Sequence, residues 1–413
     1  MNRCAVILLL AMLLAPAALA QDAPDAFEPD SALAVSDGRM ILIGKTETAT
    51  LLRLEEDGVT MARCRLEEDG SLYTPFVFAD GRTGYLVERN PYSGDSSHAF
   101  CYWGAGDAAG VPIALSGNLR DAKTCGNGFA AIQAADDAQA LVIYDDLGRL
   151  VLRHALRTER RANLVRCVQD ADGGYLAAIS YSPLEGSAYG DPWLTVLRLS
   201  PQGREVFSTE LGQRCGLAHF VLTGDGEGGA FVLFPDWDNY KVAQVFRLSP
   251  EGKVTFRGVL EAQNLICYPE TGSVDSTSGS LILTGCAISK SRGVYDVVQL
   301  AITKDGQIAW SKAWDFSARP DYSFRVQRTG DGALLAVSGR NYLDTKDTPL
   351  VAVPVSSLPE IGPPVLTLRI MGRGWQMYAH ATPPQSQAAV QPALRLRFSL
   401  ELGNVRAAAL RPA

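Results

Sequence analysis

Short apolar runs separated by turn residues recur along most of the chain. From Asp172 to Leu211 the chain reads DGGYLAAISYS, a polar stretch, WLTVLRL, the turn SPQG and REVFSTEL. The same order returns from Gly226 to Leu260 and from Ser278 to Trp314, and in a frayed form from Gly330 to Pro359. A fourth short run precedes each copy. Four strand-length runs that repeat about every 40 to 50 residues predict the four-stranded antiparallel blades of a β-propeller.

Extending this unit toward both ends of the chain gives seven blades. We therefore expect an all-β fold, a seven-bladed β-propeller over residues 31–371, followed by a tail over residues 372–413. The tail contains an alternating strand, ALRLRFSLEL, from Ala393 to Leu402. We expect this strand to pair with the first blade and close the ring, because an unpaired sheet edge promotes aggregation.

The turn between the third and fourth runs ends in glycine in three of the repeats. The turns Ser200-Pro201-Gln202-Gly203, Ser249-Pro250-Glu251-Gly252 and Thr303-Lys304-Asp305-Gly306 all stand between the third and fourth runs of a unit. Proline restricts φ and glycine accepts positive φ, so these segments predict hairpin turns.

The first twenty residues have the pattern of a secretory signal peptide. Arg3 precedes the apolar segment Ala5 to Leu14, and Ala18-Leu19-Ala20 is a small-x-small cleavage site. We expect residues 1–20 to be removed and the protein to be periplasmic or secreted. No later apolar run is long enough to predict a membrane-spanning helix. The net charge of −7 argues against nucleic acid or an anionic membrane surface as a partner.

Cysteine usage supports an oxidising compartment. Removal of the leader leaves seven cysteines, which are disulfide candidates in an exported protein. Cys267 and Cys286 are symmetric about the polar stretch between the first two strands of the sixth blade. The same construction in the fourth blade places Cys167 opposite Ser180. We therefore predict a Cys267–Cys286 disulfide. No spacing of ligand residues predicts a metal site, and no motif predicts a cofactor.

The two faces of the ring differ in their connections. With the strands of a blade labelled A to D from the centre outward, the A–B and C–D turns lie on one face and consist of plain turn residues. The B–C loops and the connections between blades lie on the other face and mix aromatic with charged side chains, which is typical of recognition surfaces. We predict a binding surface on this B–C face, with contacts from Trp237, Tyr240, Tyr189 and Arg319. The alternative is that these loops are simply polar and their aromatic side chains pack back onto the blades.

Arginines also occur where the chain enters the innermost strands. Arg166, Arg214 and Arg325 occupy such positions and would attract anions to the mouth of the central channel. The alternative is that these guanidinium groups form ion pairs with nearby acids such as Glu210 and Asp170.

The blade sequence resembles a broad class of secreted bacterial propellers. Their repeats read D-G-G-Y, then D-x-W-L-x-x-L-x-x-x-G-x-x-x-W. Here Asp172-Gly173-Gly174-Tyr175, Asp191 with Trp193 and Leu194, and Gly306 with Trp310 match this pattern. The resemblance covers nearly all of the chain after the leader. It implies the fold and no particular activity.

These observations favour an exported, non-catalytic propeller that binds a protein, a small molecule or a glycan through its B–C face. We identify no catalytic residues. The alternative is a hydrolase or lyase with charged groups at the channel mouth. Such an enzyme requires two or more titratable side chains that converge in one pocket.

Overall fold

The structure is a computed structural model. It describes residues 27–34, 40–46, 50–54, 61–65, 72–78, 83–89, 97–103, 113–135, 138–183, 193–213, 220–235, 242–262, 265–289, 294–318, 323–328, 334–339, 351–362, 366–371, 376–380, 395–401 and 404–410. The predicted signal peptide lies outside these residues.

The described strands form seven antiparallel sheets. The first four sheets contain β1 (Phe27–Ala34), β2 (Met40–Thr46), β3 (Thr50–Leu54) and β4 (Met61–Arg65); β5 (Leu72–Val77), β6 (Thr83–Arg89), β7 (Ser97–Trp103) and β8 (Ile113–Leu115); β9 (Asn118–Cys125), β10 (Gly128–Ala135), β11 (Ala138–Asp145) and β12 (Leu150–Ala155); β13 (Arg160–Gln169), β14 (Tyr175–Pro183), β15 (Trp193–Leu199) and β16 (Glu205–Gln213).

The remaining three sheets begin with strands that also follow one another along the chain. These strands are β17 (Val221–Gly224), β18 (Ala230–Pro235), β19 (Val242–Leu248) and β20 (Val254–Ala262); β21 (Leu265–Val274), β22 (Leu281–Ser289), β23 (Val294–Ile302) and β24 (Ile308–Ala318); β25 (Ser323–Arg328), β26 (Leu334–Gly339) and β27 (Val351–Pro354). A short 3-10 helix, η2 (Val355–Ser357), follows β27.

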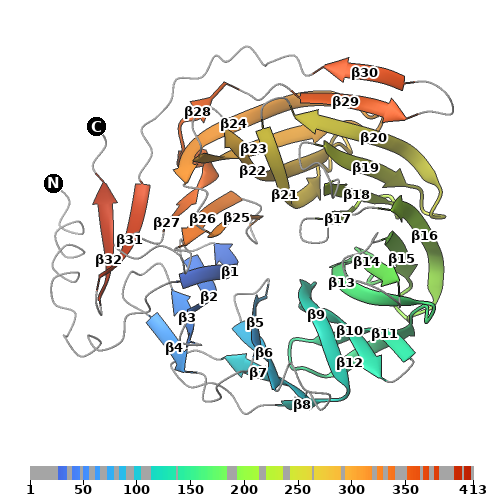
Figure 1. The fold of residues 1–413 in the computed structure, drawn as a ribbon, viewed down its shortest axis with the longest axis horizontal. Coiled ribbons are helices and arrows are strands. Elements are labelled where there is room, and N and C mark those ends of the chain that lie inside the picture. The colour runs from blue at the N-terminus through green and yellow to red at the C-terminus, as the bar shows by residue number, and fades with distance from the viewer. Residues whose placement is uncertain are drawn as a thin grey trace.

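The sheets are arranged around a central axis, with the first strand of each nearest to that axis (Figure 1). These inner strands contact one another in chain order, from β1 through β5, β9, β13, β17 and β21 to β25, and β25 contacts β1. The all-β, propeller-like architecture predicted from the repeats is confirmed.

The middle strands are buried on both faces because neighbouring sheets pack against each other. All described side chains of β18 are buried, and so are those of β14 from Tyr175 to Ser182. Leu176 and Ala178 of β14 pack with Val232 and Phe246 of the next sheet. Burial on both faces explains why these strands are continuous apolar runs rather than alternating ones.

The predicted hairpin turns between third and fourth strands are confirmed. Gly252 N donates a hydrogen bond to Ser249 O at 2.9 Å, and Gly306 N donates to Thr303 O at 2.9 Å. Both glycines have positive φ, 76° and 77°. A side chain at either glycine would also collide with a phenylalanine of the preceding sheet, Phe207 or Phe256. Glycine is therefore required by the turn and by the packing between sheets.

Strands from the C-terminal part of the chain extend the outer edges of three sheets (Figure 1). β28 (Glu360–Ile361) pairs with β24, and β29 (Leu366–Met371) pairs with β20 and with β30 (Gln376–His380). β31 (Arg395–Glu401) pairs with β27 and with β32 (Asn404–Leu410). The expected pairing of the tail strand with the first sheet is wrong. The chain leaves β27 to add β28 to the sixth sheet, so the outer edge of β27 is open to β31.

The register expected around two cysteines is also wrong. Cys167 lies opposite Ala177, because the turn from Asp170 to Gly174 is centred on Asp172 rather than between Gly173 and Gly174. In the sixth sheet, Cys267 lies opposite Ala287 and Cys286 lies opposite Tyr268. The turn there is centred one residue later than expected, and the bulge between Pro269 and Thr271 offsets only part of that shift.

The register from which the Cys267–Cys286 disulfide was predicted is therefore not the observed one. The side chain of Cys267 lies outside the described side chains, so the disulfide itself stays a prediction. A different disulfide, Cys125–Cys167, connects the innermost strands β9 and β13 of neighbouring sheets, with their Cα atoms 5.2 Å apart.

Candidate functional site

Most of the predicted binding residues cannot be placed. Trp237, Tyr240, Tyr189, Arg319 and Arg214 lie outside the described residues. Arg325 lies in β25, but its side chain is outside the described side chains. Binding through these residues stays a prediction.

Arg166 is the one predicted binding residue whose side chain the structure describes. Its guanidinium Nη1 lies 3.9 Å from Asp121 Oδ2, and its Cζ lies 4.9 Å from the centre of the Phe220 ring. The side chain is 29 % exposed. Arg166 thus contacts the sheets on both sides of its own, and its acidic neighbour is Asp121 rather than the expected Asp170 or Glu210. These contacts favour the ion-pair interpretation of this arginine.

The described part of the B–C face does combine aromatic and charged side chains. The Cζ of Arg160 lies 4.1 Å above the ring of Trp193, which begins β15. Arg160 Nη1 lies 3.0 Å from Glu210 Oε2, and Arg157 Nη1 lies 3.4 Å from the same oxygen. A cation stacked on an indole and held by a carboxylate is a preformed, partly exposed surface element.

His98 and Glu88 form a buried imidazole–carboxylate pair, and a more exposed one joins His154 Nε2 to Glu205 Oε2 at 3.6 Å. His98 Nε2 lies 3.8 Å from Glu88 Oε1, and His98 Nδ1 accepts a hydrogen bond from Leu119 N at 3.2 Å. Burial lowers the pKa of His98 and raises the pKa of Glu88. The imidazole side chain is only 1 % exposed. This arrangement fits a structural link between the second and third sheets better than a general base.

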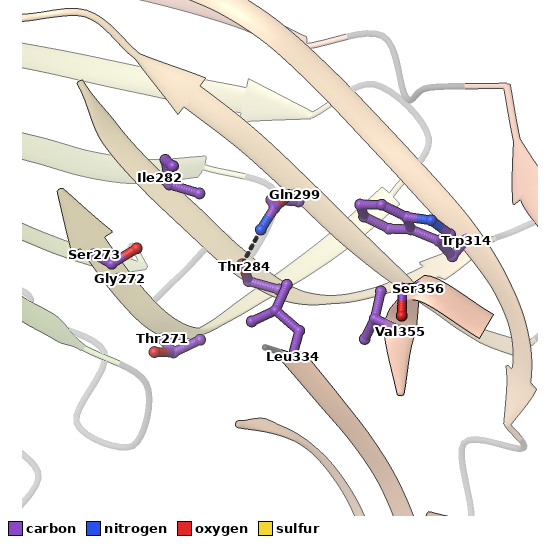
Figure 2. A pocket seen from close by; sticks show the side chains of 10 residues that line it. All are labelled: Thr271, Gly272, Ser273, Ile282, Thr284, Gln299, Trp314, Leu334, Val355 and Ser356. Atoms are coloured by element: carbon purple, nitrogen blue, oxygen red, sulfur yellow. Dashed lines mark hydrogen bonds between the residues drawn. The ribbon is translucent and has the colours of Figure 1, made fainter. Parts of the chain in front are cut away.

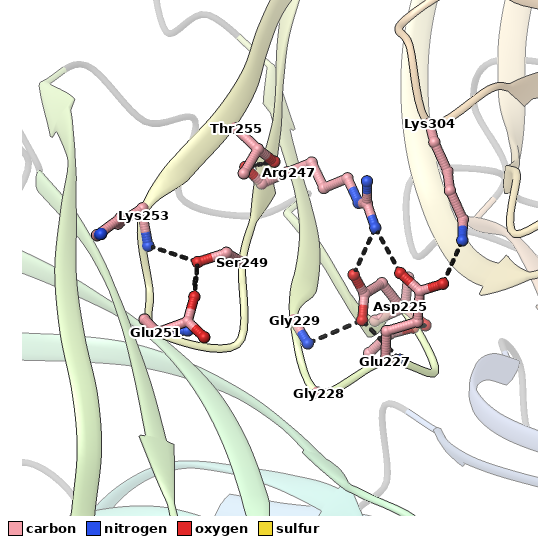
Figure 3. A network of polar contacts seen from close by, with 12 residues as sticks. Asp225, Glu227, Gly228, Gly229, Arg247, Ser249, Glu251, Lys253, Thr255 and Lys304 are labelled. Atoms are coloured by element: carbon pink, nitrogen blue, oxygen red, sulfur yellow. Dashed lines mark hydrogen bonds and ion pairs between the residues drawn. The ribbon is translucent and has the colours of Figure 1, made fainter.

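The opposite face carries an ordered network of ion pairs, which corrects the expectation of plain turn residues there (Figure 3). Arg247 Nη2 lies 3.1 Å from Asp225 Oδ2 and 2.9 Å from Glu227 Oε2. Lys304 of the sixth sheet pairs with Glu227 of the fifth, and the bond to Lys304 lowers the pKa of Glu227. In the fourth sheet Arg198 pairs with Asp170 and Asp172 and donates to Gly228 O of the fifth.

This network connects the turns of three successive sheets. Asp225 Oδ1 accepts hydrogen bonds from Glu227 N at 2.9 Å and Gly229 N at 2.8 Å, so the acid also orders its own turn. Among the described residues, no group of three or more His, Cys, Asp or Glu side chains could hold a metal ion. Each acid in the network has a cation or a turn amide as its partner, which is the pattern of a structural network.

A cavity of about 290 Å³ lies between the sixth and seventh sheets. Figure 2 shows its lining: Thr271, Gly272, Ser273, Ile282, Thr284, Gln299, Trp314, Leu334, Val355 and Ser356. The first seven come from the four strands of the sixth sheet, and the last three come from β26 and η2. Gln299 Nε2 donates a hydrogen bond to Thr284 Oγ1 at 3.1 Å.

The fifth sheet has different residues at the positions that correspond to the polar lining residues of the sixth. Counting from the pairs next to the A–B turns, Ala230–Leu248 and Leu281–Ile302, Thr284 corresponds to Leu233 and Gln299 to Val245. Trp314 corresponds to Leu260. Leu233, Val245 and Leu260 are buried in the apolar cluster between the fifth and sixth sheets.

An interface that is filled by aliphatic side chains in one repeat is thus polar and hollow in the next. Among the apolar side chains between the fifth and sixth sheets the cavity measures only about 40 Å³, and the larger hollow between these sheets, about 510 Å³, lies at their turns beside Asp225 and Lys304. The fourth sheet has Ala178 and Val196 at the first two of these positions, both fully buried. Because apolar residues make the default interface between sheets, the cluster of Thr284, Gln299 and Trp314 marks the candidate ligand site.

Loop composition does not indicate this site, because its residues lie mostly in strand interiors. The signal was present in the aligned repeats, where AFVLF in one copy corresponds to LILTG in the next. Without the register of each sheet, however, the threonine could not be matched with the glutamine on the neighbouring strand.

Comparisons with known proteins identify no family for this chain. No protein-family model matches the chain, and no curated protein sequence matches it. Among solved structures, a protein of unknown function from Bacteroides caccae is 12 % identical, with 67 % of this chain and 93 % of that chain covered and a TM-score of 0.37.

Two further solved structures are enzymes by their descriptions. One comes from a study of two prolyl endopeptidases, with 14 % identity, coverage of 90 % of this chain and 57 % of that chain, and a TM-score of 0.47. The other is a proposed 6-phosphogluconolactonase from Bacteroides fragilis, with 11 % identity, coverage of 84 % and 98 %, and a TM-score of 0.44. At these identities the similarities do not extend to function.

Proposed function

We propose that the chain forms a single seven-bladed propeller over residues 31–371 and acts as an exported, non-catalytic binding protein. Its ligand occupies the cavity between the sixth and seventh sheets. The contact of β25 with β1 supports a closed ring. The Cys125–Cys167 disulfide supports an oxidising compartment. No helix among the described residues has the length and apolar character to cross a membrane.

The exchange of apolar for polar residues at one blade interface is the observation that carries this proposal. A cavity between packed sheets lowers stability unless something fills it, and buried polar groups cost free energy unless they are hydrogen-bonded. Thr284 is 3 % exposed, yet it stands where the fifth sheet has leucine. A ligand that fills the cavity and bonds to these groups accounts for both features.

The lining also distinguishes binding from catalysis. None of the ten lining residues carries a carboxylate, an imidazole, an amine or a thiol. Acid–base catalysis needs such a group within reach of the substrate, and a serine or threonine nucleophile needs one as its activating base. A hydrolase or lyase reaction would therefore have to occur elsewhere, and the channel mouth stays the alternative.

Giving the sixth sheet the apolar residues that the fifth sheet has at the same positions is expected to abolish ligand binding. The double variant Thr284→Leu, Gln299→Val copies Leu233 and Val245. A screen of neutral small molecules by ligand-observed NMR should find binders of the wild type, and the variant should lose at least tenfold in affinity for them while its thermal midpoint is unchanged or raised.

Lys312→Ala is the matched control for this experiment. Lys312 lies opposite Gln299 in the register of β23 and β24 but does not line the cavity. Its variant should bind as the wild type does. If the wild type binds no molecule of the screen, or if the double variant binds each ligand with unchanged affinity, the cavity is not the binding site.

A protein partner at the B–C face is the second candidate function. The stack of Arg160 on Trp193 favours it, because arginine and tryptophan are enriched at the energetic centres of interfaces. Trp237 and Tyr240 stand in the sequence between β18 and β19. The double variant Trp237→Ala, Tyr240→Ala is expected to lose capture of a partner from the envelope fraction with a nearly unchanged thermal midpoint. Retained capture would contradict this role.

A further inference from the structure

We infer that the cavity between the sixth and seventh sheets binds a neutral sugar, with one pyranose ring packed against Trp314. This inference rests on the proposed function and names the chemical class of the ligand.

The charge of the lining excludes most other small ligands. Four of the ten lining residues present hydroxyl groups, one presents a primary amide and one an indole, and none is ionisable near neutral pH. Phosphates, carboxylates and amines bind where an opposite charge or a helix terminus compensates them. The lining has no charged side chain, and η2 is a single turn of 3-10 helix, too short to compensate a charge, so we infer an uncharged ligand.

The aromatic and aliphatic walls of the cavity determine the shape that the apolar surface of the ligand must have. Trp314 is half-buried and packs against the cluster that contains Val355. The other apolar surfaces are the branched side chains of Ile282, Leu334 and Val355 (Figure 2). A nucleobase stacks best between flat surfaces, whereas here only one surface is flat. A pyranose matches this asymmetry, because its C–H face can lie on the indole while its puckered opposite side meets branched side chains.

The polar groups match a polyol. Thr271, Ser273, Thr284 and Ser356 each have a hydroxyl that can donate and accept, as sugar hydroxyls do. Thr284 Oγ1 already accepts from Gln299 Nε2, so the Thr284 hydroxyl can donate its hydrogen to a ligand. Gln299 keeps its amide oxygen as an acceptor and a second N–H as a donor. The bond between the two side chains therefore orients one donor and one acceptor before the ligand arrives.

The size agrees with a single ring. The volume of about 290 Å³ is at the lower end of the range of roughly 300–1,000 Å³ for small-molecule sites. A dinucleotide or a large cofactor does not fit in this space. One sugar residue does, either free or at the end of a longer glycan.

The test uses the full-length protein without its leader and a panel of neutral methyl glycosides. Methyl glucoside, galactoside, mannoside and N-acetylglucosaminide are measured by saturation-transfer NMR, beside neutral nucleosides and amino-acid amides. At least one glycoside should bind, with the strongest transfer to the ring C–H protons that face the indole. Binding should also shift tryptophan fluorescence.

Variants then locate the bound sugar. Trp314→Leu copies the fifth sheet and Gln299→Val removes the oriented amide, and each should weaken glycoside binding at least tenfold, a loss of about 1.4 kcal/mol. Trp314→Phe keeps an aromatic face and should retain part of the affinity, which keeps the test valid if Trp314→Leu does not fold. Lys312→Ala should bind as the wild type does.

The outcomes separate this inference from the proposed function. If nucleosides or amides bind in the cavity and no glycoside does, the sugar assignment is wrong and the binding function stands. If a glycoside binds equally well to the Trp314 and Gln299 variants, the sugar site is elsewhere and the inference is wrong. If no neutral ligand binds at all, both the inference and the proposed function fail.

Discussion

Replacing Arg247 by alanine is expected to lower the free energy of unfolding by about 3–5 kcal/mol, because it leaves a buried carboxylate without its cation. The side chain of Asp225 is only 1 % exposed, and its Oδ2 lies 3.1 Å from Arg247 Nη2. Its other oxygen accepts the amide hydrogen bonds that order the turn. The loss would therefore reach the contact between the fourth, fifth and sixth sheets. Urea unfolding followed by tryptophan fluorescence measures it.

Arg149→Ala is the matched control for that change. Arg149 Nε lies 2.8 Å from Asp145 Oδ2, but the arginine side chain is 72 % exposed. Solvent screens such a pair, and its loss should cost less than about 1 kcal/mol. Equal effects of the two substitutions would show that burial does not strengthen the Arg247–Asp225 pair.

Removing the disulfide between the third and fourth sheets is expected to be almost as damaging. The double variant Cys125→Ala, Cys167→Ala opens a covalent loop between residues that are 42 positions apart. The loss of this constraint on the unfolded chain amounts to about 4 kcal/mol when the native geometry is unstrained. Both cysteines are buried, so the alanines also leave small gaps in the core. Urea unfolding with and without reductant measures the effect.

The reductant supplies the internal control. Wild-type protein should become less stable when reduced, whereas the double variant should respond much less. Peptide mapping of unreduced protein should recover Cys125 and Cys167 in one linked peptide pair. Recovery of both as separate alkylated peptides would contradict the disulfide, and an unchanged midpoint on reduction would contradict its contribution to stability.

The strands could be predicted because their signals are local. Runs such as Tyr175 to Tyr181 end at turns whose proline and glycine restrict or permit particular φ values, and β14 and its neighbours lie where these runs predicted them. The cysteine register could not be predicted in the same way. In the sixth sheet the turn is centred one residue later than expected and the bulge offsets only part of that shift, so Ala287 instead of Cys286 lies opposite Cys267, although the strands themselves are where the sequence placed them.

The candidate cavity was not predicted from the sequence, and the predicted loop surface stays a prediction. Loop composition directed attention to Trp237 and Tyr240, which lie outside the described residues. The cavity depends instead on Thr284, Gln299 and Trp314, which stand on three different strands. No local pattern distinguishes any of them within its own strand sequence, and only sheet pairing brings them together on one face.

The sequence by itself determined the repeat, the all-β class and the turns, because apolar periodicity and the φ preferences of proline and glycine act over a few residues. Only the tertiary structure decided what lies between the sheets. The inter-blade disulfide, the ion pairs from Arg198 to Lys304 and the cavity beside Trp314 all join residues from different strands or different sheets. Such contacts depend on register and on the packing of one sheet against the next, and a single residue of shift in either would change every partner.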